Sequence, residues 1–265
     1  MMNISVIGAG YVGLITGIGF AKLNHQVSII DLNNDLIKNL NENIAPFYEP
    51  ELENNLNDLK ISNNLHFSTN YQKSIDENTD IVFVCVQTPT DPDSGKIKIE
   101  HIASALTELK KLESFNFIIC IKSTIKGSLV EKITNEIDLD YKKIIFNPEF
   151  LREGSAFYDF FNPDRIVIGG SDQKGIDRCL ELYEPFDCEK IITDSNSSQM
   201  IKYLSNTYLA MRLSFVNETY RLVSEFNGNP NEVLRAIGSD KRIGNNYFRP
   251  SPGWGGSCFP KDVKE

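Results

Sequence analysis

The chain has 265 residues, of which 41% are hydrophobic and 24% charged, a composition typical of a globular protein with one or two domains. Its formal net charge of −9 argues against a general affinity for nucleic acid or for an anionic membrane, so we expect neither as a partner. No apolar run approaches the roughly 20 residues that cross a bilayer, and the first residues lack a signal-peptide pattern, which predicts a cytoplasmic protein.

Short β-rich runs alternate with helical patterns through the first 195 residues. This alternation predicts an α/β fold, a doubly wound, Rossmann-like and mainly parallel sheet with helices on both faces. Several runs are almost entirely apolar, as in strands that are covered on both faces. The expected strands are Ile4–Ile7, Gln26–Asp31, Leu65–Ser68, Asp80–Val86, Phe117–Lys122, Lys143–Phe146, Arg165–Ile168 and Lys190–Thr193.

The first strand runs into a turn in which Gly8, Gly10 and Gly13 match G-x-G-x-x-G, and a helical pattern follows. Such glycines allow a tight turn and let the backbone approach a pyrophosphate at a helix N-terminus. Asp31 ends the next strand, where its carboxylate can accept hydrogen bonds from ribose hydroxyls and repel a 2′-phosphate. The pattern predicts NAD rather than NADP as cofactor in residues 1–195; FAD or a purely structural turn is the alternative.

Three loops, 87–95, 122–127 and 146–154, follow apolar strands, which is where ligands bind in a doubly wound sheet. In the third loop, Glu149 and Glu153 are four residues apart, so a helical turn would present both carboxylates on one side. Next to a cofactor, such a pair can position water or accept a proton. The alternative is that Glu149 caps a helix while Glu153 lies in solvent.

After Thr193 the pattern becomes helical, and we assign residues 196–265 to a second region. Residues 194–198 offer N-cap groups for one long helix from Met200 to about Phe226, and a short helix is expected from Asn231 to Ile237. An apolar stripe at spacings of three and four predicts a face in the core or at a subunit interface, so we expect a homodimer or a larger assembly. The stripe comprises Ile201, Leu204, Tyr208, Met211, Phe215, Thr219 and Leu222.

Two side chains on the long helix, Lys202 and Asn206, are also four residues apart and share a face. A lysine and an amide directed at one point can stabilise a developing oxyanion, although most helical lysines are simply solvated.

Cys258 lies in the glycine-rich turn 255–262 and is followed by Lys261 and Asp262. Small neighbours expose the sulfur and a nearby cation favours the nucleophilic thiolate. A nicotinamide site together with such a thiol suggests oxidation of an alcohol or aldehyde through a thioester. The five cysteines form no C-x-x-C pair and the three histidines are scattered, which predicts no metal site.

These motifs, in this order, resemble the UDP-glucose/GDP-mannose dehydrogenase family over essentially the whole chain. The motifs that carry the resemblance are Gly8–Gly13, Thr88-Pro-Thr90, Lys122-Ser-Thr124, Asn147–Gly154, Met200–Tyr203 with Asn206, Lys241–Gly244 and Gly255–Asp262. The resemblance implies oxidation of a nucleotide sugar, UDP-glucose, at C6 to UDP-glucuronate, with two hydride transfers to NAD. GDP-mannose or another nucleotide sugar is the alternative substrate, although Phe259 and the Arg242-Ile-Gly244 segment favour UDP-glucose. A second alternative is a catalytically silent fragment that binds NAD or dimerises.

The resemblance also implies roles for individual residues. Cys258 would form a thiohemiacetal and then a thioester, Lys202 and Asn206 would stabilise oxyanions, and protons and water would be handled by Asp262, Thr124 and Glu149. The cofactor-binding set would be Gly8, Gly10, Tyr11, Val12, Gly13, Asp31, Thr88, Pro89, Thr124, Glu153 and Lys261. The substrate-binding set would be Glu149, Phe150, Leu151, Arg152, Glu153, Lys202, Asn206, Arg242, Tyr247, Arg249, Ser251 and Gly253.

Members of this family continue into a further domain that holds the UDP portion, and none of that domain is present in these 265 residues. We therefore expect the 265 residues alone to bind NAD but to turn over UDP-glucose negligibly, because remote binding energy orients the reacting carbon.

Overall fold

The computed structural model describes residues 1–91, 96–256 and 259–264. The chain divides into two compact units, Met1–Thr88 with Lys98–Met200, and Pro89–Ile97 with Ile201–Glu265. The long helix α9 (Ser195–Glu225) begins in the first unit and continues in the second. The boundary that we placed between residues 195 and 196 stays a prediction.

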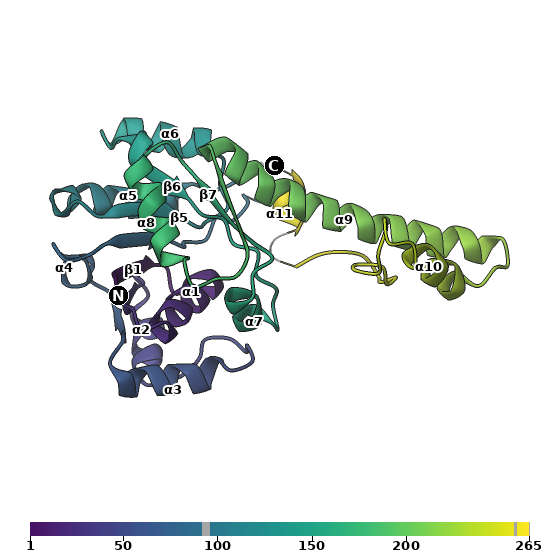
Figure 1. Ribbon diagram of the computed structural model, residues 1–265, viewed down its shortest axis with the longest axis horizontal. Coiled ribbons are helices and arrows are strands. Elements are labelled where there is room, and N and C mark those ends of the chain that lie inside the picture. The colour runs from purple at the N-terminus through teal and green to yellow at the C-terminus, as the bar shows by residue number, and fades with distance from the viewer. Residues whose placement is uncertain (92–95, 257–258, 265) are drawn as a thin grey trace. The chain divides into compact units, whose positions relative to one another are not determined.

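Among the described residues, eight strands form one sheet in the order β3-β2-β1-β4-β5-β6-β7-β8. Each predicted strand is present, with ends that differ by at most two residues, and Figure 1 shows several of them at the centre of the first unit. Their bounds are β1 (Asn3–Ile7), β2 (Gln26–Ile30), β3 (Leu65–Ser68), β4 (Ile81–Val84), β5 (Ile118–Ile121), β6 (Ile144–Phe146), β7 (Arg165–Gly169) and β8 (Glu189–Thr193).

The sheet is parallel except where β6 meets β7, whose antiparallel pairing joins Phe146 to Gly169. The mainly parallel, doubly wound fold is therefore confirmed. β1 has β2 on one side and β4 on the other, so the strand order reverses direction at β1. In such sheets, the crevice beyond the carboxyl ends of the strands at this reversal is where ligands bind.

Alternate residues of the central strands enter two hydrophobic cores, one on each face of the sheet. On β4, Ile81 and Phe83 belong to the first core, whereas Val82 and Val84 belong to the second. Helices α1 and α8 contribute to the first core, and α5 and α6 contribute to the second. Burial on both faces explains why these strands are almost entirely apolar.

The remaining elements of the first unit are helices and short 3₁₀ turns. Their bounds are α1 (Tyr11–Lys22), α2 (Asn34–Asn41), α3 (Leu52–Ser62), α4 (Tyr71–Ser74), α5 (Glu100–Lys110), η1 (Glu113–Phe115), α6 (Gly127–Glu136), η2 (Tyr141–Lys143), α7 (Ala156–Phe161) and α8 (Gln173–Leu182).

Helix α9 begins at Ser195, five residues before the start we predicted at Met200. The cause is a single cap, since the Asp194 carboxylate accepts from the backbone N–H groups of Asn196 and Ser197, both at 2.9 Å. The small polar residues that we read as a cap segment therefore form the first turn of the helix.

The second unit contains most of α9 together with α10 (Pro230–Gly238) and α11 (Phe259–Lys264). Asn229 caps α10, and Pro230 occupies its first turn, where no backbone donor is needed. A small core of Val216, Leu234 and Phe248 joins α9 to α10 and to the loop that follows. Across the described residues, no helix combines the length and the apolar character needed to span a membrane.

Candidate functional site

Two glycines of the turn after β1 are required by the packing of the protein itself. Gly8 has φ +101°, and a Cβ there would lie 2.7 Å from the carbonyl oxygen of Cys85. A Cβ on Gly13 would lie 1.8 Å from the carbonyl oxygen of Gly8. The turn therefore folds tightly against the end of β4 only with glycine at both positions.

Gly10 differs, because a Cβ there would meet nothing within 4 Å. It is the N-cap of α1 and supplies no side-chain hydrogen bond to that helix. There is therefore room beside Gly10 at the start of α1, and the N-terminus of a helix is suited to bind a pyrophosphate. Tyr11 and Val12, the first two residues of the helix, are both half-buried.

Asp31 directly follows β2, and its carboxylate is held between two backbone donors. Its Oδ2 accepts from Ala9 N at 2.8 Å and its Oδ1 from Asn33 N at 2.9 Å. The structure thus brings the acidic residue and the glycine-rich turn together. Together with the room at Gly10, this arrangement fits a dinucleotide with a free ribose 2′-hydroxyl.

The loops after β4 and β5 meet through Thr88, whose hydroxyl donates to the carbonyl oxygen of Thr124 at 3.1 Å. Both residues are buried at the carboxyl ends of their strands. Pro89, which we predicted in the same cofactor set, begins the segment 89–97 that groups with the second unit.

Lys122 directly follows β5 and is buried, with 6% of its surface exposed. Its Nζ donates to Asn147 Oδ1 at 2.8 Å and lies 5.7 Å from the centre of the Phe83 ring. Asn147 also accepts from the Tyr183 hydroxyl at 2.5 Å and donates to Val167 O at 2.8 Å. Burial lowers the pKa of Lys122, because a desolvated ammonium is disfavoured. This network fixes the residue that precedes Pro148 and the loop carrying Glu149.

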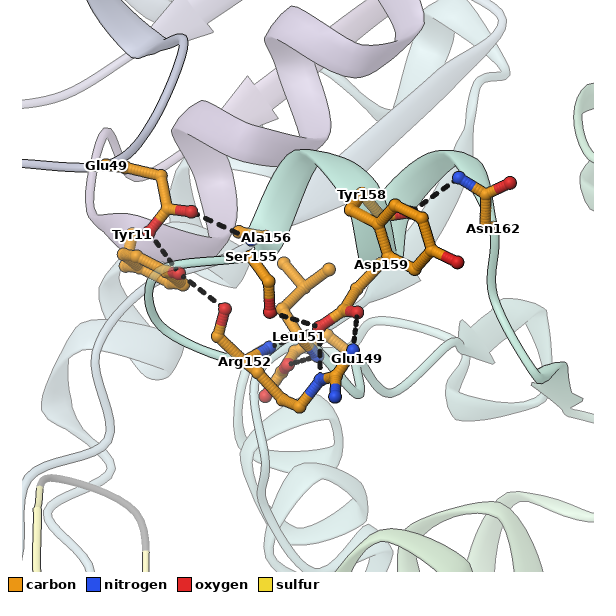
Figure 2. Close-up of polar contacts among 10 residues, drawn as sticks. All are labelled: Tyr11, Glu49, Glu149, Leu151, Arg152, Ser155, Ala156, Tyr158, Asp159 and Asn162. Carbon is orange, nitrogen blue, oxygen red and sulfur yellow. Dashed lines mark hydrogen bonds and ion pairs between the residues drawn. The ribbon is translucent and has the colours of Figure 1, made fainter.

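The loop after β6 is not the helical turn that we expected from the spacing of Glu149 and Glu153. It is irregular from 147 to 152 and turns at Glu153 and Gly154. Glu149 Oε2 accepts from Leu151 N at 2.7 Å, which sets a local bend instead of a helix (Figure 2). Glu149 is half-buried and Glu153 is exposed.

Arg152 and Phe150 of this loop are each held by a neighbour. The Arg152 guanidinium pairs with Asp159 of α7, with Nε to Oδ2 at 2.9 Å. The Phe150 ring lies under the Arg165 guanidinium, 3.9 Å from its carbon to the ring centre. Both cations thus stabilise the loop that we predicted to contact substrate, and Leu151 packs against the first core.

In the second unit, α9 and α11 bring together a buried polar cluster. Asn206 Nδ2 donates to Asp262 Oδ2 at 2.6 Å, and Lys261 Nζ lies 3.0 Å from Asp262 Oδ1. Asp262 and Lys202 are 3% and 4% exposed, so Lys202 is not one of the solvated helical lysines that formed the alternative interpretation. Cys258, the predicted nucleophile, lies outside the described residues.

The predicted substrate residues of the loop between α10 and α11 are mostly exposed. Arg242 pairs with Asp240, and Arg249 is exposed. Tyr247 has φ +57°, and the Ser251 hydroxyl donates to Gly253 O at 2.9 Å.

Sequence reasoning missed Arg212, which donates from α9 to the carbonyl oxygens of Ile243 and Gly244, both at 2.9 Å. It also missed Glu49, a buried carboxylate that contacts Tyr11. Neither residue belongs to a motif. Within the described part of the chain, no group of three or more His, Cys, Asp or Glu side chains is arranged to hold a metal ion.

Residues 2–187 match the NAD-binding domain of the UDP-glucose/GDP-mannose dehydrogenase family, and residues 196–265 match its central domain. The chain belongs to this family. Membership confirms the resemblance seen in the sequence and confirms NAD as the cofactor of the first domain.

The chain is 38% identical to UDP-glucose 6-dehydrogenase YwqF of Bacillus subtilis over 270 residues, covering 99% of this chain and 60% of that protein. Among solved structures, it resembles a UDP-glucose dehydrogenase from Pyrobaculum islandicum with a TM-score of 0.92 and 36% identity, over 100% of this chain and 62% of that one. It also resembles a GDP-mannose dehydrogenase from Pseudomonas aeruginosa, solved as a ternary complex, with a TM-score of 0.86 and 28% identity. This match covers 99% of this chain and 63% of that one. The chain therefore spans about three fifths of the length of these relatives.

Proposed function

We propose that this chain supplies the cofactor site and catalytic centre for the NAD-dependent oxidation of UDP-glucose at C6 to UDP-glucuronate. The observation that carries the proposal is the buried pair of Asn206 and Asp262, with Lys261 half-buried beside Asp262 and Lys202 buried one turn before Asn206 on the same helix. Burying several ionisable groups is costly, and such clusters concentrate at functional sites. Cys258 lies four residues before Asp262 in the sequence.

In this proposal, the turn at Gly8–Gly13 binds the pyrophosphate of NAD, and Asp31 accepts hydrogen bonds from the adenosine ribose. Thr88, Thr124, Glu153 and Lys261 are assigned to the cofactor by family analogy. When bound, NAD⁺ supplies a hydride acceptor. The hydrogen bond from Ala9 N already gives the Asp31 carboxylate a defined position, which supports this assignment.

Cys258 is proposed to form the covalent intermediate. The C6 alcohol first loses its hydroxyl proton and a hydride, which one NAD⁺ accepts, to give the aldehyde. The Cys258 thiolate adds to the aldehyde, and the thiohemiacetal loses a second hydride, to a second NAD⁺, and a proton to leave a thioester. Water then hydrolyses the thioester to the carboxylate and frees the thiolate. Lys202 and Asn206 stabilise the oxyanions. Asn206 has two N–H hydrogens, and the one not donated to Asp262 is proposed to face the substrate oxygen.

Asp262, Thr124 and Glu149 are proposed to transfer protons and to position water. The nucleotide sugar is assigned to the loop after β6, from Glu149 to Glu153, and to the loop before α11, where Arg242, Tyr247, Arg249, Ser251 and Gly253 lie. The organised state of Phe150 and Arg152 supports this assignment, because a loop held by cation–π and ion-pair contacts loses less entropy when substrate binds.

We further propose that the chain forms a homodimer through α9. Leu204, Tyr208, Met211, Phe215 and Leu222 are each more than half exposed and lie on one face of the helix, the face opposite Lys202 and Asn206. An exposed apolar stripe of this length favours burial against the same stripe of a second copy.

GDP-mannose is the alternative substrate, favoured by the likeness to the GDP-mannose dehydrogenase structure. The test is to mix the product of the complete gene with NAD and either UDP-glucose or GDP-mannose, and to follow NADH. We expect NADH with UDP-glucose and at most a small fraction of that rate with GDP-mannose. Faster NADH formation with GDP-mannose than with UDP-glucose would make GDP-mannose the substrate. No NADH formation with either sugar would favour a catalytically silent NAD-binding module.

A further inference from the structure

Glu49 is a buried carboxylate, only 5% exposed, in the segment between α2 and α3. It accepts three hydrogen bonds of 2.8 Å, from the Tyr11 hydroxyl and Gly154 N to Oε2 and from Ala156 N to Oε1. Figure 2 shows the carboxylate between Tyr11 and Ala156. A buried charge is tolerated only when donors satisfy it, so these bonds hold the segments that supply them in place.

The donors come from two parts of the chain with different proposed roles. Tyr11 is the first residue of α1 and follows Gly10, where the pyrophosphate is proposed to bind. Gly154 and Ala156 end the loop that carries Glu149 and Arg152 and begin α7. One carboxylate therefore connects the cofactor turn to the loop proposed to contact substrate.

Tyr11 makes the connection specific. Its hydroxyl lies 2.8 Å from Glu49 and 3.1 Å from the carbonyl oxygen of Arg152, and its single hydrogen favours the charged acceptor. The ring lies beside Phe47, with ring centres 5.2 Å apart, which fixes its direction. Burial and the Glu49 charge raise the pKa of Tyr11, so the phenol stays a donor at physiological pH.

Three further hydrogen bonds in this segment are local to the loop and the start of α7. Glu149 bonds Leu151, and Arg152 and Ser155 bond Asp159, so these contacts shape the loop without joining it to α1 (Figure 2). Tyr11 and Glu49 join the first turn of α1 to this loop by hydrogen bonds, whereas Phe20 of α1 and Phe160 of α7 join the two helices by apolar packing.

We propose that Glu49 and Tyr11 act as positioning residues that transmit NAD binding at Gly10 to the loop 149–156. A pyrophosphate held by the first turn of α1 restrains Tyr11, which strengthens its bond to Glu49 and so the bonds from Glu49 to Gly154 and Ala156. By linkage, ordering of the loop favours NAD to the same extent. The role of the loop in oxidation rests on the proposed function, whereas the coupling itself requires only NAD.

The test is hydrogen–deuterium exchange of peptides covering 149–156, with and without saturating NAD, in the 265-residue chain. We compare wild type with Tyr11→Phe, which removes one hydroxyl, and with Tyr48→Phe, a matched control whose side chain is 90% exposed. NAD should slow exchange in wild type and control by about 5-fold or more, the size of a modest allosteric coupling. Titration should show that Tyr11→Phe still binds NAD. In this variant, NAD should slow exchange of the 149–156 peptides by less than about 2-fold.

Equal slowing in wild type and Tyr11→Phe would overturn the proposal, as would the absence of any slowing in wild type. If Tyr11→Phe does not fold, Glu49→Gln is judged by the same comparison, because its amide nitrogen cannot accept a hydrogen bond. In the complete gene product, loss of the coupling should lower kcat in Tyr11→Phe and weaken NAD binding by about the same factor as the lost slowing of exchange. A failure to oxidise UDP-glucose would defeat the proposed function and leave the exchange result unaffected.

Discussion

Asp31 Oδ2 accepts a hydrogen bond from the backbone N–H of Ala9, 2.8 Å away. The residue proposed to select the cofactor is thus fixed to the middle of the glycine-rich turn that is proposed to bind it. The carboxylate therefore has a defined position before any ligand arrives, which reduces the ordering cost of binding.

Cofactor choice should follow from this carboxylate. The double variant Asp31→Ser with Leu32→Arg replaces this carboxylate and adds a cation at its exposed neighbour. It should raise the ratio of NADP to NAD affinity by about tenfold or more, because a 2′-phosphate is no longer repelled and gains a positive partner. Asp35→Ser, which removes an exposed carboxylate on α2, is the control and should leave the ratio unchanged. Equal binding of NAD and NADP by the unmodified chain would refute the role given to Asp31.

Gly10 and Gly13 should respond oppositely to the same substitution. Gly13→Ala should destabilise the fold by about 1–3 kcal/mol or prevent folding, because its Cβ would overlap Gly8 O. Gly10→Ala has open space and an ordinary φ of −75°, so it should keep the wild-type Tm and lose NAD affinity. Thermal denaturation and NAD titration separate the two effects. Unchanged NAD affinity in Gly10→Ala would show that the pyrophosphate lies elsewhere.

Burial of Lys122 should give the protein a distinctive pH dependence. Its folded pKa is lowered below the unfolded value of about 10.5, so between the two pKa values the unfolded state binds more protons and stability rises with pH. Lys122→Met removes this rise. In urea unfolding at pH 7 and 9.5, the free energy of unfolding of wild type relative to Lys122→Met should be larger at the higher pH. Lys132→Met, at an exposed site, is the control, and its free energy of unfolding should change with pH as that of wild type does. The same difference in free energy of unfolding between Lys122→Met and wild type at both pH values would show that the amine is not desolvated.

Assembly should depend on the exposed face of α9. Met211→Glu places a charge in the middle of the apolar stripe and should convert the proposed dimer to a monomer in light scattering. Ser224→Glu, an exposed position on another face of the helix, should leave the mass unchanged. A monomeric wild type would contradict the proposed interface.

Strand positions and the cofactor turn could be predicted from sequence because they depend on local patterns. The apolar run 81–84 and the glycines at 8, 10 and 13 each carry their structural reason within a few residues. The spacing of Glu149 and Glu153 was misleading, because Glu149 instead bonds the backbone of Leu151. Glu49 could not be found, since its partners Gly154 and Ala156 are more than 100 residues away in sequence.

Cys258→Ser should abolish uronate formation by the complete gene product and leave NAD binding nearly intact. A serine hydroxyl is a poor nucleophile at neutral pH without a dedicated base, so the thioester cannot be replaced by an ester at a useful rate. Uronate is measured by mass spectrometry and NAD by titration. Uronate turnover within a few-fold of wild type would exclude the thioester route.

In the proposed reaction, one chain carries the sugar through both oxidations, from alcohol to carboxylate. The most direct measurement is the ratio of NADH to UDP-glucuronate formed from limiting UDP-glucose by the complete gene product. Because each NAD⁺ accepts two electrons and the conversion releases four, we predict two NADH for each uronate formed. One NADH per sugar with an aldehyde as product, or no NADH at all, would contradict the account.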